Sequence, residues 1–166
     1  MRHVFFLSLL LLPAPVAAAP ETYTPKGGGF SVHLPGEPKE KSQTAKTPIG
    51  ELKIQTATYA TADGSVYLVS YTDFPPGAIK PEDHGKLIDA VRDALKGKDG
   101  KVVSEKEIAV GPEKGREVVI DRGKQQTRFR VVVKDHRLYQ LAAVGTGEFV
   151  TGKDATAFLD SFEFAK

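Results

Sequence analysis

The feature that most constrains the fold of this chain is an alternation of apolar and polar residues with a period of two. Successive side chains of a β-strand point to opposite faces, so this period predicts strands over most of the body of the chain. With 166 residues, of which 40% are apolar, the chain is long enough to bury the core of one domain. The predicted strands cover residues 30–34, 39–47, 50–60, 65–73, 101–110, 116–121, 125–134 and 137–144.

The first long hairpin is predicted to turn at the dipeptide Asp63-Gly64, whose glycine suits a positive φ. A two-residue turn there places Thr58 opposite Val69 on one face and Tyr59 opposite Leu68 on the other. Both faces of this hairpin then carry apolar side chains. Since exposed apolar faces are unfavourable in water, the sheet is expected to need cover on both sides.

Part of that cover is predicted to come from a helix over residues 81–96. Pro81 suits the first helical position, and Gly97 suits the C-terminal end. An apolar stripe with helical spacing runs through Leu87, Ile88, Val91 and Leu95.

A second helix is predicted over residues 152–161, next to a G-x-x-x-x-G-K match in residues 147–153. A phosphate-binding loop needs Ser or Thr at the next position, but Asp154 stands there and would repel a polyanion. The favoured interpretation is structural, with Thr151 as N-cap and Asp154 completing a variant of the capping box. No nucleotide or other cofactor is therefore predicted.

The N-terminus has the pattern of a signal peptide. Residues 1–18 hold a basic start and a short apolar run, and Val16 and Ala18 supply the small residues that favour cleavage after Ala18. Residues 19–29, which end in three glycines, are predicted to be a flexible leader before a single domain at 30–166. The chain has no cysteine for lipid attachment, so export to the periplasm or beyond is expected, with no membrane span in the mature form.

Several of these segments resemble bacterial exported proteins of the PsbP/Mog1-like fold group. The resemblance rests on the opening Gly29-Phe30-Ser31-Val32-His33-Leu34-Pro35-Gly36-Glu37-Pro38, the helix after Pro81, the β-rich second half and the closing Phe158-Leu159-Asp160-Ser161-Phe162. It implies an α+β fold in which helices pack on both faces of a single antiparallel sheet, an α/β/α sandwich. It also implies a binding or assembly role, and it transfers no functional residue to this chain.

The sequence offers no local signature of catalysis or metal binding. It has no cysteine and no G-x-S-x-G elbow, and His33, His84 and His136 lack the spacing of a metal site. No catalytic, cofactor-binding or metal-binding residue is therefore predicted. A hydrolase whose active site is assembled from distant residues stays open as an alternative.

The one candidate binding surface is a basic sheet face. With turns at Arg122-Gly123 and Asp135-His136, alternation gathers five side chains on one face and sets Glu117 directly opposite Arg128. Because the formal net charge is only +2, no nucleic acid is expected, and any anion binding requires charges gathered in space. The candidate residues are Arg128, Arg130, Lys134, Arg137 and Tyr139.

Two interpretations of this basic face stay open: it binds an acidic protein or an anionic envelope component, or it is merely solvated. Together these observations predict an exported, non-catalytic binding or assembly module, with a small exported hydrolase as the alternative.

Overall fold

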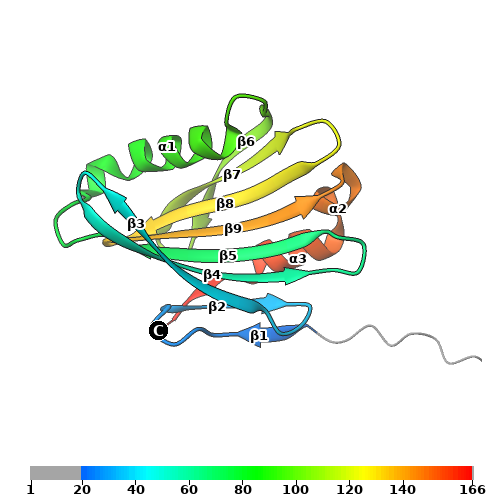
Figure 1. Cartoon of the computed structure of the whole chain (residues 1–166), viewed down its shortest axis with the longest axis horizontal. Coiled ribbons are helices and arrows are strands. Elements are labelled where there is room, and N and C mark those ends of the chain that lie inside the picture. Colours follow the sequence, from blue (N-terminus) through cyan, green and yellow to red (C-terminus); the bar gives the residue numbers. More distant parts are fainter. Residues whose placement is uncertain (1–19, 166) are drawn as a thin grey trace, which may run out of the picture.

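The computed structural model describes residues 20–165, and the predicted signal peptide with its predicted cleavage after Ala18 lies outside them. Within these residues the chain forms ten strands, one 3-10 turn and three α-helices (Figure 1). In chain order they are β1 (Glu21–Tyr23), β2 (Phe30–Leu34), β3 (Lys39–Thr47), β4 (Gly50–Ala60), β5 (Val66–Asp73), η1 (Pro81–Asp83), α1 (His84–Lys96), β6 (Lys101–Val110), β7 (Glu113–Asp121), β8 (Gln126–Lys134), β9 (Arg137–Gly145), α2 (Gly147–Thr151), α3 (Lys153–Asp160) and β10 (Glu163–Phe164).

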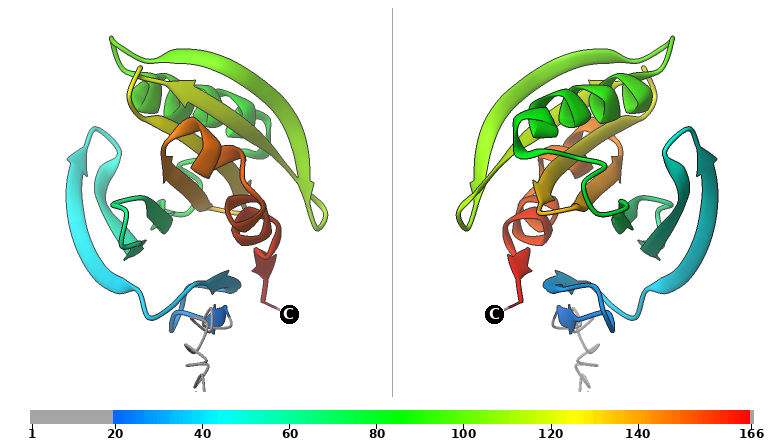
Figure 2. Two further views of the ribbon diagram at one scale, coloured as in Figure 1. Left: turned by 90° about the vertical axis from the view of Figure 1, so that its right-hand side faces the viewer. Right: turned by 90° about the vertical axis from the view of Figure 1, so that its left-hand side faces the viewer.

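The strands form two antiparallel sheets. The main sheet has seven strands in the order β3-β4-β5-β9-β8-β7-β6, and the small sheet has three in the order β1-β2-β10. Figure 2 shows how strongly the main sheet curves, with its edge strands β3 and β6 on opposite sides of the molecule. The prediction of a single sheet is therefore wrong. It fails because β2 turns away from the main sheet and pairs with segments from both ends of the chain.

One face of the main sheet packs against α1 and is called here the α1 face. Its core includes Ile88 from the helix together with inward side chains of β7, β8 and β9. The period of two is observed on this face, since alternate side chains of β7, β8 and β9 lie in that core. They are Val118, Ile120, Phe129, Val131, Val133, Leu138 and Ala142.

The opposite face of the main sheet is covered by α3 and the small sheet, which share a second core with it. Phe30 of β2 stacks on Phe162 with their ring centroids 5.2 Å apart, and both rings contact Tyr139 of β9 edge to face. Because a small sheet provides much of this cover, the molecule differs from the predicted sandwich of one sheet between helices. This face is called here the inner face.

The hairpin of β4 and β5 departs from the predicted register. Ala60 pairs with Val66, so the connection spans five residues, and Tyr59 lies opposite Tyr67 rather than Leu68. The Asp63 carboxylate accepts hydrogen bonds from the Thr61 hydroxyl and the Ser65 backbone N–H, and these bonds hold the longer loop. The predicted positive φ at position 64 is confirmed. The pairing of β4 with β5 is shifted by one residue from the predicted register, so different side chains of the two strands share a face.

The predicted flexible leader over residues 19–29 is also corrected, because Glu21–Tyr23 forms β1 and pairs with β2. The turn that follows is held by a bond from the Gly28 backbone N–H to the Pro25 carbonyl, at 2.9 Å. Turn-forming residues therefore build an ordered connection here.

The second predicted helix is confirmed as α3, and a short helix that was not predicted, α2, precedes it. Thr146 caps α2 by accepting a hydrogen bond from the Phe149 N–H at 3.2 Å, and Gly152 is the N-cap of α3. Thr151 was predicted as the cap, but it ends α2 and its hydroxyl donates to the Gly147 carbonyl at 2.8 Å.

Candidate binding groove

The structure places the predicted basic residues together on the inner face of the main sheet, where α2, α3 and the small sheet lie over them. The hairpin of β7 and β8 turns one position later than predicted, so Glu117 lies opposite Arg130, and Val119 lies opposite Arg128. The shift in register keeps Glu117, Arg128 and Arg130 on the same face of the sheet. The side chains of Arg128 and Arg130 are only 12% and 15% exposed.

Both arginines bind the nearly buried carboxylate of Glu117. The Nε of Arg130 lies 2.6 Å from Glu117 Oε2, and Arg128 Nη2 lies 3.1 Å from Oε1. Burial raises the pKa of Glu117, but hydrogen bonds from Arg130 and Lys106 and the arginine charges outweigh burial, so the pKa lies below its ordinary value. The carboxylate therefore stays ionised between its cationic partners.

The same two arginines also anchor the helices that cover the sheet. Arg128 donates to the Val150 carbonyl and the Thr156 hydroxyl, at 3.3 and 2.9 Å. Arg130 donates to the Leu159 carbonyl at 2.9 Å and pairs with Asp160 at 2.6 Å. Their positive charge is thus directed at α2 and α3.

Arg137 fixes the turn after β1 in a similar way. It makes two bonds to Asp73, at 2.5 and 2.9 Å, and donates to the carbonyls of Gly27 and Gly28, each at 2.7 Å. Its guanidinium also lies over the Tyr71 ring, 4.8 Å from the centroid.

The last two members of the predicted basic face contact the C-terminal strand. Lys134 Nζ lies 4.6 Å from the centroid of the Phe164 ring, and Tyr139 packs against Phe164 with centroids 5.3 Å apart. Anion binding by this face stays a prediction, while the contacts show that its side chains hold the cover of the sheet in place.

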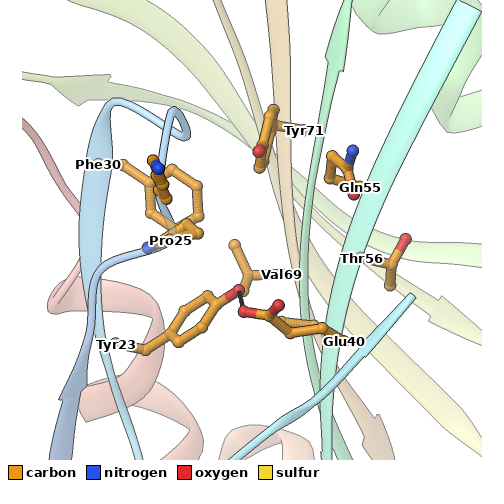
Figure 3. A pocket seen from close by; sticks show the side chains of 10 residues that line it. Tyr23, Pro25, Phe30, Glu40, Gln55, Thr56, Val69 and Tyr71 are labelled. Atoms are coloured by element: carbon orange, nitrogen blue, oxygen red, sulfur yellow. Dashed lines mark hydrogen bonds between the residues drawn. The ribbon is translucent and has the colours of Figure 1, made fainter. Parts of the chain in front are cut away.

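Two hollows lie along the contact region between the small sheet and strands β4 and β5, called here the seam. The smaller hollow, of about 170 Å³, lies between β1, β2 and strands β3 to β5 (Figure 3). The Tyr23 hydroxyl points across it and donates to Glu40 Oε1 at 2.7 Å. Burial and this carboxylate raise the pKa of Tyr23, so the phenol keeps its proton and can donate this hydrogen bond.

The larger hollow, called here the seam groove, has a volume of about 660 Å³. That volume lies in the range of roughly 300–1,000 Å³ that is typical of ligand sites. Three parts of the chain form its walls: the ends of the β1–β2 hairpin, the hairpin of β4 and β5, and the pair α2 and α3. Its lining residues are Pro20, His33, Pro35, Tyr59, Thr61, Asp63, Tyr67, Phe149, Asp154, Ala157 and Phe158.

Aromatic rings form much of this lining. The Tyr67 ring packs between Phe149 and Phe158, with both centroid distances 5.1 Å. Tyr59 lies directly opposite Tyr67 across the hairpin. The groove therefore presents a fixed apolar floor whose rings are held by the inner core.

The seam groove has two acidic lining residues, Asp63 and Asp154. Burial raises the pKa of the Tyr67 phenol, and the negative charges of Asp154 and Asp63 raise it further. Hydrogen bonds from Thr61 and the Ser65 backbone hold the pKa of Asp63 below its ordinary value. The groove thus combines the ionised carboxylate of Asp63 with a neutral phenol. Among the described residues that line it there is no lysine or arginine.

This groove was not predicted from the sequence, because its walls come from segments that are distant in the chain. One available signal was the pair of tyrosines at positions 59 and 67, which face each other once the loop is given its correct length. Of the three histidines considered as metal ligands, His33 lines the groove. Within residues 20–165, no group of three His, Asp or Glu side chains is arranged to hold a metal ion. No helix of this same part of the chain is long and apolar enough to cross a membrane.

No protein-family model matches the chain, and no curated protein does. Among solved structures, the solution structure of cyanobacterial PsbP (CyanoP) from Synechocystis sp. PCC 6803 is similar. Its TM-score is 0.58 at 11% identity, over 93% of this chain and 98% of that protein. The crystal structure of PA94 from Pseudomonas aeruginosa, a protein of unknown function, gives a TM-score of 0.40 at 10% identity, over 82% and 90% of the two chains. The similarity to CyanoP extends over nearly the whole of both proteins, and the chain therefore has a PsbP-like fold.

Proposed function

We propose that this protein is a non-catalytic binding module and that its ligand site is the seam groove. The observation that carries the proposal is a preformed groove of about 660 Å³ with an aromatic floor. Tyrosine and phenylalanine provide large contact areas at a low cost in side-chain entropy, which makes them typical of binding surfaces. Packing holds these rings in place, so a ligand would not have to order them.

The carboxylate of the loop supports binding rather than proton transfer. Asp63 accepts hydrogen bonds from Thr61 and Ser65, and the same bonds lower its pKa. A general acid would need the opposite shift, toward neutral pH. The hydrolase alternative has no comparable observation in its favour.

We further propose that the protein acts after export, as the signal-peptide pattern of residues 1–18 indicates. Its ligand would then be a component of the periplasm or of the extracellular medium. Mass spectrometry of the protein from its host should find a mature chain that begins at residue 19. Recovery of cytoplasmic protein with an intact Met1 would contradict export.

A groove-filling variant tests the proposed site. Ala157 is exposed on α3 and lines the groove, so Ala157→Trp would fill the groove without removing a core side chain. Ala94 is exposed on α1 and lies outside the lining, so Ala94→Trp is the matched control. The probe is the neutral fluorophore N-phenyl-1-naphthylamine, whose emission rises in apolar surroundings.

We expect saturable binding by the wild type and by Ala94→Trp, and about tenfold weaker binding by Ala157→Trp, because the indole occupies the space of the probe. Equal binding by both variants would place the probe elsewhere. No binding by any of the three proteins would contradict a preformed apolar site.

A further inference from the structure

The ligand class of the seam groove follows from the charges on its walls. Two of its lining residues are carboxylates, on separate elements: Asp63 in the loop between β4 and β5, and Asp154 in the first turn of α3. Both carboxylates line the groove together with Tyr67, and their negative charge helps to raise the pKa of its phenol. A ligand that places a cation there gains attraction from two sides.

The aromatic rings of the groove also favour a positively charged ligand group. Ring faces carry negative electrostatic potential, and a lysine or arginine head within about 6 Å of a ring centroid is attracted to it. The chain uses this interaction itself, with the guanidinium of Arg137 at 4.8 Å from the Tyr71 centroid. Tyr67 and Phe149 line the same groove as the two carboxylates, which places both kinds of attraction in one groove.

A hydrogen-bonding group completes the set. The Tyr67 hydroxyl makes no hydrogen bond within residues 20–165, and it is not among the buried polar atoms that lack a partner. Tyr67 lines the groove. Its raised pKa keeps it neutral, so it can donate to a carbonyl oxygen of a ligand.

Resting on the proposed function, we infer that the seam groove binds a polypeptide segment in which lysine or arginine alternates with apolar side chains. The basic groups meet Asp63 and Asp154, the apolar groups lie on the rings, and a backbone carbonyl accepts from Tyr67. Binding of an extended segment in a groove lined by aromatic rings is a recurring mode of peptide recognition, and Tyr59, Tyr67 and Phe149 line this groove.

The inference is tested by isothermal titration calorimetry with three capped tetrapeptides that alternate phenylalanine with lysine, glutamine or glutamate. We expect affinity to fall in that order, by about threefold for each change of one charge near a carboxylate. The preference should be strong at an ionic strength of about 0.01 M and nearly absent at about 1 M, because the screening length falls from roughly 30 to 3 Å.

Asp154→Asn should weaken binding of the lysine peptide by about threefold and leave the glutamine peptide unaffected. Glu82→Gln is the matched control, since Glu82 is also an exposed acid in a first helical turn but lies outside the groove. This control should bind like the wild type. Asp63 is less suited to substitution because it holds its own loop.

The outcomes separate this inference from the proposed function. Equal binding of the three peptides, or binding of none of them by a protein that still takes up N-phenyl-1-naphthylamine, would overturn the charge preference and leave the groove a binding site. Loss of dye binding as well would overturn both. Phenethylamine carries the same ring and cation without a peptide backbone, and an affinity equal to that of the lysine peptide would overturn the polypeptide assignment.

Discussion

At the scale of single residues, Glu117 determines how the basic face is used. The sequence places this acid among the arginines, and that placement is confirmed, but the alternation of side chains does not show that helices cover the same face. With its side chain 6% exposed, Glu117 balances two buried guanidinium groups that also bind α2 and α3. A buried carboxylate with several donors is costly to neutralise, because its partners then lose their counter-charge.

The variant Glu117→Gln is expected to lower the free energy of unfolding by about 3 kcal/mol, since it leaves Arg128 and Arg130 buried without their common partner. Urea denaturation at neutral pH measures the change. The matched control is Glu107→Gln on the exposed edge strand β6, which should alter stability by no more than about 0.5 kcal/mol. Equal effects of the two substitutions would contradict a structural role for the cluster.

The loss of stability caused by Glu117→Gln should depend on pH. The pKa of Glu117 is lower in the folded protein than its ordinary value of 4.5. Its charge therefore stabilises the folded state fully above that value, and the contribution is lost as the pH falls through the folded pKa. The difference in unfolding free energy between wild type and Glu117→Gln should be constant near neutral pH and should shrink in acid. A difference that stays constant into the acid range would be inconsistent with this mechanism.

At the scale of helices and strands, the sequence predicted most elements well where local signals decide them. β4 and β6 were predicted with their observed bounds. The first helix was predicted over residues 81–96, and its first three residues form the 3-10 turn η1 while α1 ends before the predicted Gly97. The predictions failed where the structure is determined by side-chain hydrogen bonds or by contacts between segments that are distant in the chain. The Asp63 bonds lengthen a loop and shift the register, and pairing with β2 orders residues 21–23. The groove was missed for the same reason, because contacts between distant segments create it.

The corrected helix cap leads to a comparison of two threonines. Thr146→Ala should destabilise the protein by about 1 kcal/mol, because the Phe149 N–H at the start of α2 loses its acceptor. Thr151→Ala removes a hydroxyl that bonds back to carbonyls of its own helix, so it should cost less than about 0.5 kcal/mol. Urea denaturation of the two variants in parallel tests the order, and a larger loss for Thr151→Ala would restore the cap predicted from the sequence.

At the scale of the whole molecule, the two cores lie on opposite faces of the same central strands. In β8, Val132 belongs to the core of the inner face, whereas Val131 and Val133 belong to the core under α1. In β9, Tyr139 belongs to the core of the inner face and Leu138 to the core under α1. Neither core keeps its packing if these strands separate, so the described domain is expected to unfold as one cooperative unit.

The distribution of tyrosines makes this cooperativity measurable. All five tyrosines of the chain lie in or against the core of the inner face, and the chain has no tryptophan. Intrinsic fluorescence therefore reports on the inner face alone, whereas far-UV circular dichroism reports on both sheets and the helices. If the domain is one unit, the two signals should give the same urea midpoint.

A substitution on the α1 face provides the decisive comparison. Ile88 is 5% exposed in the core beneath α1 and lies on the far side of the sheet from every tyrosine. Ile88→Val removes one methyl group from a packed site and should cost about 1 kcal/mol. Because β8 and β9 carry both cores, the tyrosine signal should move to lower urea by the same amount as the circular dichroism signal. A fluorescence midpoint that stays at the wild-type value while the circular dichroism midpoint falls would show that the two faces unfold separately.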